Sequence, residues 1–136
     1  NLTKGGGGAL LQEKVVASAS KKLVIIVDES KLVDKLASKF FIPVEILPFS
    51  LGVVQRKIEA FGVEPILRQA ERKMGPVVTD NGNFILDLKF PKPLDNPAKT
   101  AIDLKMIPGV VETGLFIGMT DEVHVGTEDK SYIIKK

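Results

Sequence analysis

The order of apolar runs and turn residues across positions 43–117 is the feature that most restricts the fold of this chain. A strand is predicted over Val44–Leu47, which lies between two prolines, and a helix over Leu51–Phe61, where Gly62 supplies a C-terminal cap. Prolines at both ends of a strand are typical of a short or edge strand. The stretch therefore opens with a strand and then a helix.

The second half of this stretch predicts two strands, a helix and a last strand. Asp80–Asn83 contains an Asn-Gly step, a strong hairpin signal, between Val77–Thr79 and the next apolar run. Asn96 and Pro97 are typical of a helix start, and Pro108–Gly109 of a helix end. The predicted strands lie over 65–69, 84–90 and 110–117. The order is β-α-β-β-α-β, which predicts a ferredoxin-like lobe with two helices on one face of an antiparallel sheet.

The residues before this lobe predict a second kind of layer. The uninterrupted apolar run Leu23–Val27 is typical of a strand covered on both faces in a parallel sheet. A helix is predicted from Gly8 to about Lys21, and another after Ser30, on the stripe Leu32, Val33, Leu36 and Phe40.

Together these patterns predict an α/β fold with an α+β lobe inserted. Residues 1–41 form part of a Rossmann-like lobe, residues 42–118 form the ferredoxin-like lobe, and a hairpin in residues 119–136 returns to the first lobe.

Composition excludes several classes of function. A net charge of +2 and an aromatic content of 6% provide neither a basic face nor stacking platforms, so nucleic acid is not the expected partner. The apolar run Leu23–Val27 is far too short to span a membrane. With no cysteine and one histidine, His124, we expect no disulfide, no metal site and no cysteine nucleophile, which fits a cytoplasmic protein.

Lys4 precedes four glycines, Gly5, Gly6, Gly7 and Gly8, which run directly into a predicted helix. Backbone without side chains can approach a ligand closely, and N–H groups at a helix start favour an anion or a developing oxyanion. The lysine adds a positive charge. The alternative is a flexible linker.

Glu13 lies about one turn inside that helix, and its neighbours three and four positions away are all apolar. A partly desolvated carboxylate can accept and return a proton near neutral pH, as a general base for C–H abstraction must. The alternative is a surface glutamate paired with Lys14 or Lys21.

Lys31 follows the carboxyl end of the predicted parallel strand, where open α/β sheets bind their ligands. The alternative is a solvated lysine at a helix start. Arg68, Arg72 and Lys73 form either a positive rim or a solvated loop, and His124 has no partner that would make it a metal ligand.

Five motifs follow one another in this sequence and together resemble ribose-5-phosphate isomerase, type A. They are Lys4-Gly-Gly-Gly-Gly-Ala-Leu-Leu-Gln-Glu-Lys14, Val27-Asp-Glu-Ser-Lys31, Pro43-Val-Glu-Ile-Leu-Pro48, Val78-Thr-Asp-Asn-Gly-Asn83 and Ile107-Pro-Gly-Val-Val-Glu112. The lysine-glycine-glutamate block is the most specific of them.

The resemblance implies an aldose-ketose isomerase of the non-oxidative pentose phosphate pathway that converts a phosphosugar through an enediolate, without metal or cofactor. Matched by position, Glu13 is the proton-shuttling base, Lys4, Gly5, Gly6 and Gly7 contact the substrate, and Lys31 binds it. The resemblance also implies a homodimer or homotetramer.

The family's glycine-serine-threonine phosphate loop and its acidic Asp-Gly-Ala-Asp-Glu motif do not occur in these residues. We therefore expect the C-terminal portion of a longer isomerase, inactive by itself. Two alternatives stay open: a sugar-phosphate-sensing module without turnover, and a structural or regulatory ferredoxin-like module.

Overall fold

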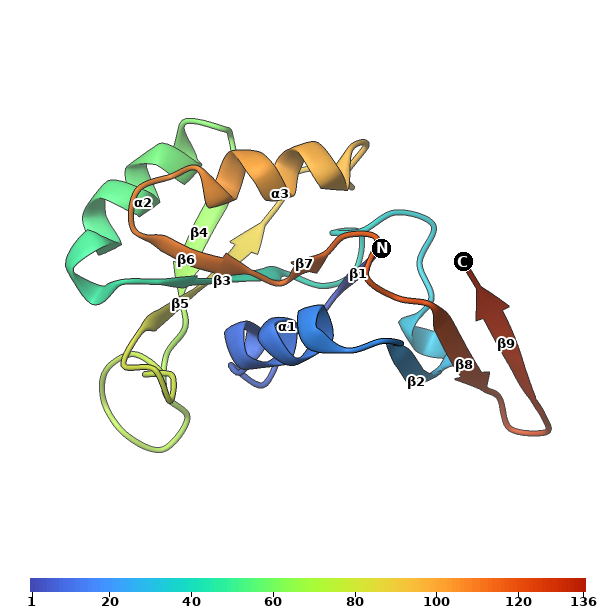
Figure 1. Ribbon diagram of the computed structural model, residues 1–136. Coiled ribbons are helices and arrows are strands. Elements are labelled where there is room, and N and C mark those ends of the chain that lie inside the picture. Colours follow the sequence, from blue (N-terminus) through green and yellow to red (C-terminus); the bar gives the residue numbers. More distant parts are fainter.

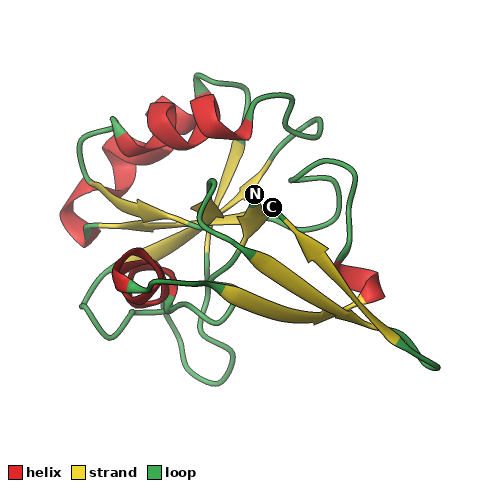
Figure 2. Cartoon of the chain, turned by 45° about the vertical axis from the view of Figure 1, so that its right-hand side comes forward, coloured by secondary structure: helices red, strands yellow, loops and turns green.

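The computed structural model describes residues 1–136 and contains three α-helices and three β-sheets. In Figure 1, α2 (Leu51–Glu59) and α3 (Pro97–Lys105) lie on one side of the largest sheet, and α1 (Leu10–Ala19) lies on the other side. Figure 2 shows the same arrangement, with a second sheet set apart from the first. No helix is long and apolar enough to cross a membrane.

The largest sheet has four strands in the order β4-β5-β3-β6, with every neighbouring pair antiparallel. The strands are β3 (Ile42–Ile46), β4 (Glu64–Leu67), β5 (Phe84–Lys89) and β6 (Val110–Thr113). Asn96 caps α3 as predicted, because its side-chain oxygen accepts a hydrogen bond from the Lys99 N–H at 3.0 Å. The element order is the predicted β-α-β-β-α-β.

The hydrophobic core lies between this sheet and α2 and α3. Alternate residues of β3 and β5, including Val44, Ile46 and Leu86, are fully buried, and they pack in one cluster with Ile58 of α2 and Leu104 of α3. The other face of the same strands carries polar residues, among them Glu45, which lies directly opposite Glu112 of β6. The two faces of the sheet therefore have different chemistry.

The flanking prolines indicated a short or an edge strand, and the edge alternative is wrong, since β3 lies between β5 and β6. Pro43 is tolerated there for a local reason. The Pro43 carbonyl accepts the Gly114 N–H at 2.7 Å, so it points away from β5 and toward the segment that follows β6. The Pro43 nitrogen points the same way, beyond the end of β6 at Thr113, and the hydrogen bond that proline cannot donate is therefore not part of the pairing with β5. The ladder with β5 remains intact.

The predicted hairpin at Asp80–Asn83 and the predicted last strand of this unit are both less regular than expected. Residues 77–79 form no strand and contribute one bridge, between Val78 and Phe84, although the turn after them closes through Thr79 N–H to Asn83 O at 2.8 Å. The strand predicted over 110–117 is divided at Gly114 into β6 and β7 (Leu115–Phe116).

The second sheet has three strands in the order β2-β8-β9. β2 (Val24–Asp28) is parallel to β8 (Glu122–Gly126), which forms the predicted hairpin with β9 (Ser131–Lys135). The prediction that β2 is covered on both faces is wrong: exposed and half-buried residues alternate along it, and Ile26 is 82% exposed. β2 is an edge strand with one neighbour, and α1 packs against β3 and β6 instead.

The helix predicted after Ser30 does not form, so this prediction is also wrong. A short 3-10 turn, η1 (Glu29–Lys31), ends at Leu32 in extended backbone, and Ala37 has a positive φ of 63°. The apolar side chains of Leu36 and Ala37 instead pack against the hydrophobic core, and the Leu36 carbonyl accepts the Leu94 N–H at 2.9 Å. Tertiary packing has overridden the helical pattern.

Helix α1 is fixed to the polar face of the four-stranded sheet by one buried leucine and one partly buried ion pair. Leu10 is fully buried at its first turn. The Lys14 ammonium donates to Glu112 Oε1 at 2.8 Å and to the Leu115 carbonyl at 2.9 Å, and it lies 4.9 Å from the centre of the Phe116 ring.

The pKa values of Lys14 and Glu112 are both shifted in this ion pair. Burial lowers the pKa of Lys14, while the hydrogen bond and charge of Glu112 oppose that effect. Burial raises the pKa of Glu112, but hydrogen bonds from Lys14 and the Thr113 N–H and the nearby charge of Lys14 outweigh it, so its net pKa lies below the ordinary value. The folded chain therefore favours the ionised carboxylate.

Replacing Leu10 by Ala should lower the free energy of unfolding by about 2–5 kcal/mol, because it leaves a cavity under the glycine loop. Val16→Ala is the matched control: Val16 lies on the same helix but is 66% exposed, so it should cost less than about 1 kcal/mol. Urea unfolding measures both. Equal losses would contradict the packing described for α1.

The Glu112 carboxylate should make stability fall in acid. Its pKa is lower in the folded chain than in the unfolded chain, so its contribution is present above about pH 4.3 and is lost as the pH falls through the folded pKa. Glu112→Gln should weaken this acid dependence and cost about 1–3 kcal/mol at pH 7, since Lys14 then lacks its counter-charge. Urea unfolding at several pH values, with exposed Glu59→Gln as control, tests this; parallel pH curves for Glu112→Gln and the parent chain would refute it.

Candidate functional site

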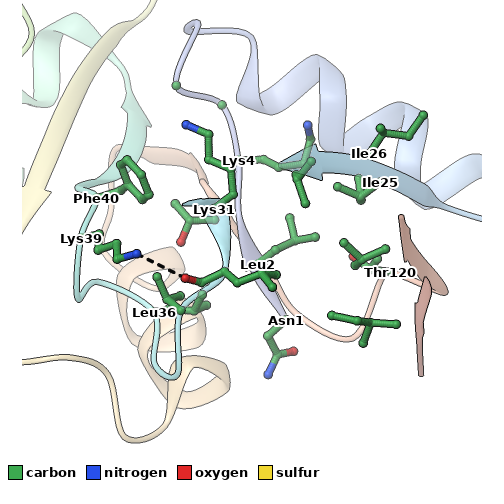
Figure 3. A pocket seen from close by; sticks show the side chains of 18 of the residues that line it. Asn1, Leu2, Lys4, Ile25, Ile26, Lys31, Leu36, Lys39, Phe40 and Thr120 are labelled. Carbon is green, nitrogen blue, oxygen red and sulfur yellow. Dashed lines mark hydrogen bonds between the residues drawn. The ribbon is translucent and has the colours of Figure 1, made fainter. Parts of the chain in front are cut away.

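A pocket of about 700 Å³ lies between the N-terminal segment, the three-stranded sheet and the loop that follows η1. Figure 3 shows it between the loop that carries Lys39 and Phe40 on one side and the strand that carries Ile25 and Ile26 on the other. Lys4 extends from the segment between them. The volume is within the range of about 300–1,000 Å³ usual for small-molecule sites.

Lys4 is fixed by the short strand before it. β1 (Leu2–Thr3) pairs antiparallel with β7, and the Lys4 N–H donates to the Gly114 carbonyl at 2.9 Å. A Cβ on Gly114 would lie 2.5 Å from the Lys4 carbonyl oxygen and 2.7 Å from the Pro43 ring, so only glycine allows this approach. Gly114, which divides the strand predicted over 110–117, is therefore also the residue to which the Lys4 backbone is hydrogen-bonded.

The glycine loop turns sharply between Lys4 and α1. Gly5 has a φ of +87°, its carbonyl accepts the Gly8 N–H at 2.9 Å, and a Cβ on it would lie 2.3 Å from the Leu10 Cβ. Gly6 and Gly7 differ, since a Cβ on either would meet nothing within 4 Å. Gly5 is therefore required by packing, whereas Gly6 and Gly7 present open backbone to the pocket.

Glu13 faces Lys4 across the loop. The Lys4 Nζ lies 2.9 Å from Glu13 Oε2, and the two side chains are 34% and 31% exposed. Oε2 itself is inaccessible to solvent and accepts no well-aligned hydrogen bond. The alternative pairing of Glu13 with Lys14 or Lys21 is not observed, because Lys14 is engaged by Glu112 and Lys21 forms no ion pair.

Lys31 reaches the pocket from η1, where its Nζ lies 5.0 Å from the centre of the Phe40 ring. Asp28 precedes it and has a structural contact: hydrogen bonds from the Ser30 side chain and from the Ser30 N–H, the latter at 2.9 Å, lower the pKa of Asp28. All six residues predicted from the sequence line this one pocket: Lys4, Gly5, Gly6, Gly7, Glu13 and Lys31.

Further charged residues of the pocket were missed by sequence reasoning. Lys39, Lys135, Lys136 and Asp121 also line it, so five lysines face two carboxylates. Lys39 was assigned to a helix that does not form, and Lys135 and Lys136 come from a hairpin whose position relative to the pocket no local pattern indicates. The excess of lysine makes the pocket suited to an anionic ligand.

The other candidate residues lie away from this lining. Arg72 and Lys73 are in an exposed loop, and His124 lies on β8, where its Nε2 is 3.3 Å from Glu122 Oε2. Arg68 pairs with Asp87 beside the glycine loop. No three histidine, cysteine, aspartate or glutamate side chains are arranged to hold a metal ion.

The arrangement combines a carboxylate, an adjacent ammonium and free backbone N–H groups in one anion-suited pocket. A carboxylate so placed can move a proton, and positive groups beside it can stabilise negative charge that develops on a bound oxygen. The arrangement is therefore suited to an anionic small molecule whose reaction involves a proton transfer.

Comparisons with known proteins agree with one another. Residues 1–130 match the family described as ribose 5-phosphate isomerase A (phosphoriboisomerase A). The chain is 48% identical over 103 residues to ribose-5-phosphate isomerase A of Trichodesmium erythraeum, covering 76% of this chain and 43% of that protein. It is 52% identical over 96 residues to ribose-5-phosphate isomerase of Dictyostelium discoideum, covering 69% and 41%.

Solved structures give the same result. The structure of ribose 5-phosphate isomerase A from Methanocaldococcus jannaschii superposes with a TM-score of 0.94 at 45% identity, covering 99% of this chain and 59% of that one. A D-ribose-5-phosphate isomerase in complex with phospho-erythronic acid gives a TM-score of 0.95 at 40% identity, covering 99% and 58%.

The chain spans less than half the length of these two curated relatives. The family match nevertheless covers residues 1–130 and includes the glycine loop, Glu13 and Lys31. This chain therefore belongs to the ribose-5-phosphate isomerase A family.

Proposed function

We propose that this chain carries the proton-transfer site of an aldose-ketose isomerase that interconverts D-ribose 5-phosphate and D-ribulose 5-phosphate through an enediolate. The observation that carries the proposal is the 2.9 Å contact between Lys4 and Glu13 in a pocket that also contains Gly5–Gly7 and Lys31. Family membership supplies the substrate class.

In the aldose-to-ketose direction, Glu13 is the general base. It removes the proton from C2 of the open-chain sugar and returns it to C1, while the O2 hydroxyl proton moves to O1, so the atoms balance. The Lys4 ammonium and the free N–H groups of Gly6 and Gly7 stabilise the negative charge on the enediolate oxygens. No metal or cofactor takes part in this scheme.

Lys31 and the other lysines of the pocket hold the phosphorylated end of the substrate. Phospho-erythronic acid, the ligand of one solved relative, is likewise a small phosphorylated molecule and should bind in the same pocket. The chain spans only part of its relatives, so we propose that full activity requires the rest of that length and that the 136-residue chain alone is inactive.

The finer architecture is part of the same proposal. The strand order β4-β5-β3-β6 with α2 and α3 on one face supports a ferredoxin-like lobe over residues 42–118. The parallel pairing of β2 with β8 supports a Rossmann-like lobe made of residues 1–41 and 119–136. We also propose that the protein acts in the cytoplasm as a homodimer or homotetramer.

Glu13→Gln in the full gene product should lower kcat for ribose 5-phosphate by about 10²–10⁴-fold, because glutamine cannot accept the proton. KM should change by less than about threefold, since the amide keeps the size of the side chain. Glu59→Gln, an exposed change on α2, is the control and should leave both constants unaltered.

Steady-state assays of ribulose 5-phosphate formation give both constants. A Glu13→Gln variant with the parent kcat would contradict the role of Glu13. Binding of ribose 5-phosphate without turnover by the parent full gene product would instead support the sugar-phosphate-sensing alternative.

Lys31→Met should raise KM for ribose 5-phosphate by about tenfold or more, because a charge pair with the phosphate is lost. Lys73→Met removes the same charge from the exposed loop at residues 71–75 and should leave KM unchanged. The assay compares the two variants across a substrate series. Equal KM values for both variants would show that Lys31 does not bind the substrate.

A further inference from the structure

Arg68 joins the four-stranded sheet to the glycine loop, although it does not line the pocket. It follows β4 directly, and its Nη1 donates to the Gly6 carbonyl at 2.8 Å. Its Nε and Nη2 donate to the two carboxylate oxygens of Asp87 on β5, at 2.7 and 2.5 Å. The Arg68 and Asp87 side chains are only 19% and 17% exposed, so the pair is largely removed from solvent.

This contact fixes the direction of one peptide group. The Gly6–Gly7 peptide is planar and trans, so the Gly6 carbonyl and the Gly7 N–H point in opposite directions. The carbonyl is directed to Arg68 on the sheet side. The Gly7 N–H is therefore directed away from the sheet, and it donates no hydrogen bond within the chain.

Little else holds this peptide. A Cβ on Gly6 or Gly7 would meet nothing within 4 Å, so side-chain packing does not restrain the turn. The Gly8 N–H bond to the Gly5 carbonyl closes the turn but leaves the peptide between Gly6 and Gly7 free to rotate. The Arg68 guanidinium, held at two points by Asp87, supplies the missing restraint.

We propose that Arg68, oriented by Asp87, is a positioning residue that aims the Gly7 N–H into the pocket at the developing enediolate oxygen. The inference rests on the proposed isomerase function and deepens it. A donor held in place before the reaction stabilises the transition state without reorganisation, so Arg68 acts on kcat through Gly7 without contacting the substrate.

The test uses the full gene product with Arg68→Gln, Arg68→Lys and Asp87→Asn, and Arg72→Gln as the control in the exposed loop. Arg68→Gln should lower kcat by about 10–100-fold with KM changed less than about threefold, because the donor is misdirected rather than removed. Arg68→Lys should be intermediate, since one ammonium cannot match the three-bond fork. Asp87→Asn should also lower kcat.

A second readout separates positioning from a general loss of stability. In Arg68→Gln the Gly8 amide should exchange with solvent deuterium at least about tenfold faster than in the parent, while amides of β3 and β5 should not, at a temperature where both proteins are folded. Arg72→Gln should change neither exchange nor kinetics.

Arg68→Gln with the kcat of Arg72→Gln would overturn the inference while leaving the isomerase proposal intact. A kcat loss that disappears after correction for the folded fraction would overturn it too. If the parent protein has no isomerase activity, the proposed function itself fails, which is a distinct result.

Discussion

The polar face of the four-stranded sheet is the constraint on which the pocket depends. Ion pairs at two points attach the α1 segment to this face: Glu112 holds Lys14 of the helix, and Asp87 holds Arg68, which in turn holds the glycine loop. Both acidic residues belong to strands whose opposite face forms the hydrophobic core with α2 and α3. The packed core thus fixes the strands, and the strands in turn restrain the segment that carries Lys4 and Glu13.

Two glycines also let the N-terminal segment and the glycine loop lie close to neighbouring backbone and side chains. Gly114 lets the N-terminal segment lie against Pro43, and Gly5 lets the loop turn over Leu10. The ion pair between Lys4 and Glu13 is partly buried, and such a pair contributes only modestly to net stability because desolvation offsets much of the attraction. Its role is to position the two groups, since it keeps the Glu13 carboxylate and the Lys4 ammonium at a fixed separation in the pocket.

The sequence was most informative where the signal is local. The Asn96 cap and the Asn81-Gly82 turn depend on residues only a few positions apart, and both formed as predicted. Prediction was poorer for elements that depend on neighbours distant in the chain. Leu36 carries a helical stripe, yet it packs against another unit in irregular backbone, and the apolar run at Ile26 does not reveal that β2 has only one neighbour.

The residues of the pocket were likewise predicted only where the sequence signal is local. Lys4, Glu13 and Lys31 stood out because each lies next to a recognisable local feature, a glycine run, a helix start or a strand end. Lys39 and Lys135 did not, and Arg68 was noted only as part of a positive rim or a solvated loop, because the relation of these residues to the pocket or the glycine loop arises from contacts across the fold. Their roles become visible only when the strands are paired.

The most direct test of the central claim is an NMR titration of the backbone amides of residues 1–136 with ribose 5-phosphate. We predict that the amides of Gly5, Gly6, Gly7 and Lys31 shift together, with one dissociation constant, because they border one pocket. Shifts confined to the exposed loop at Arg72 and Lys73, with the glycine loop unchanged, would contradict the account.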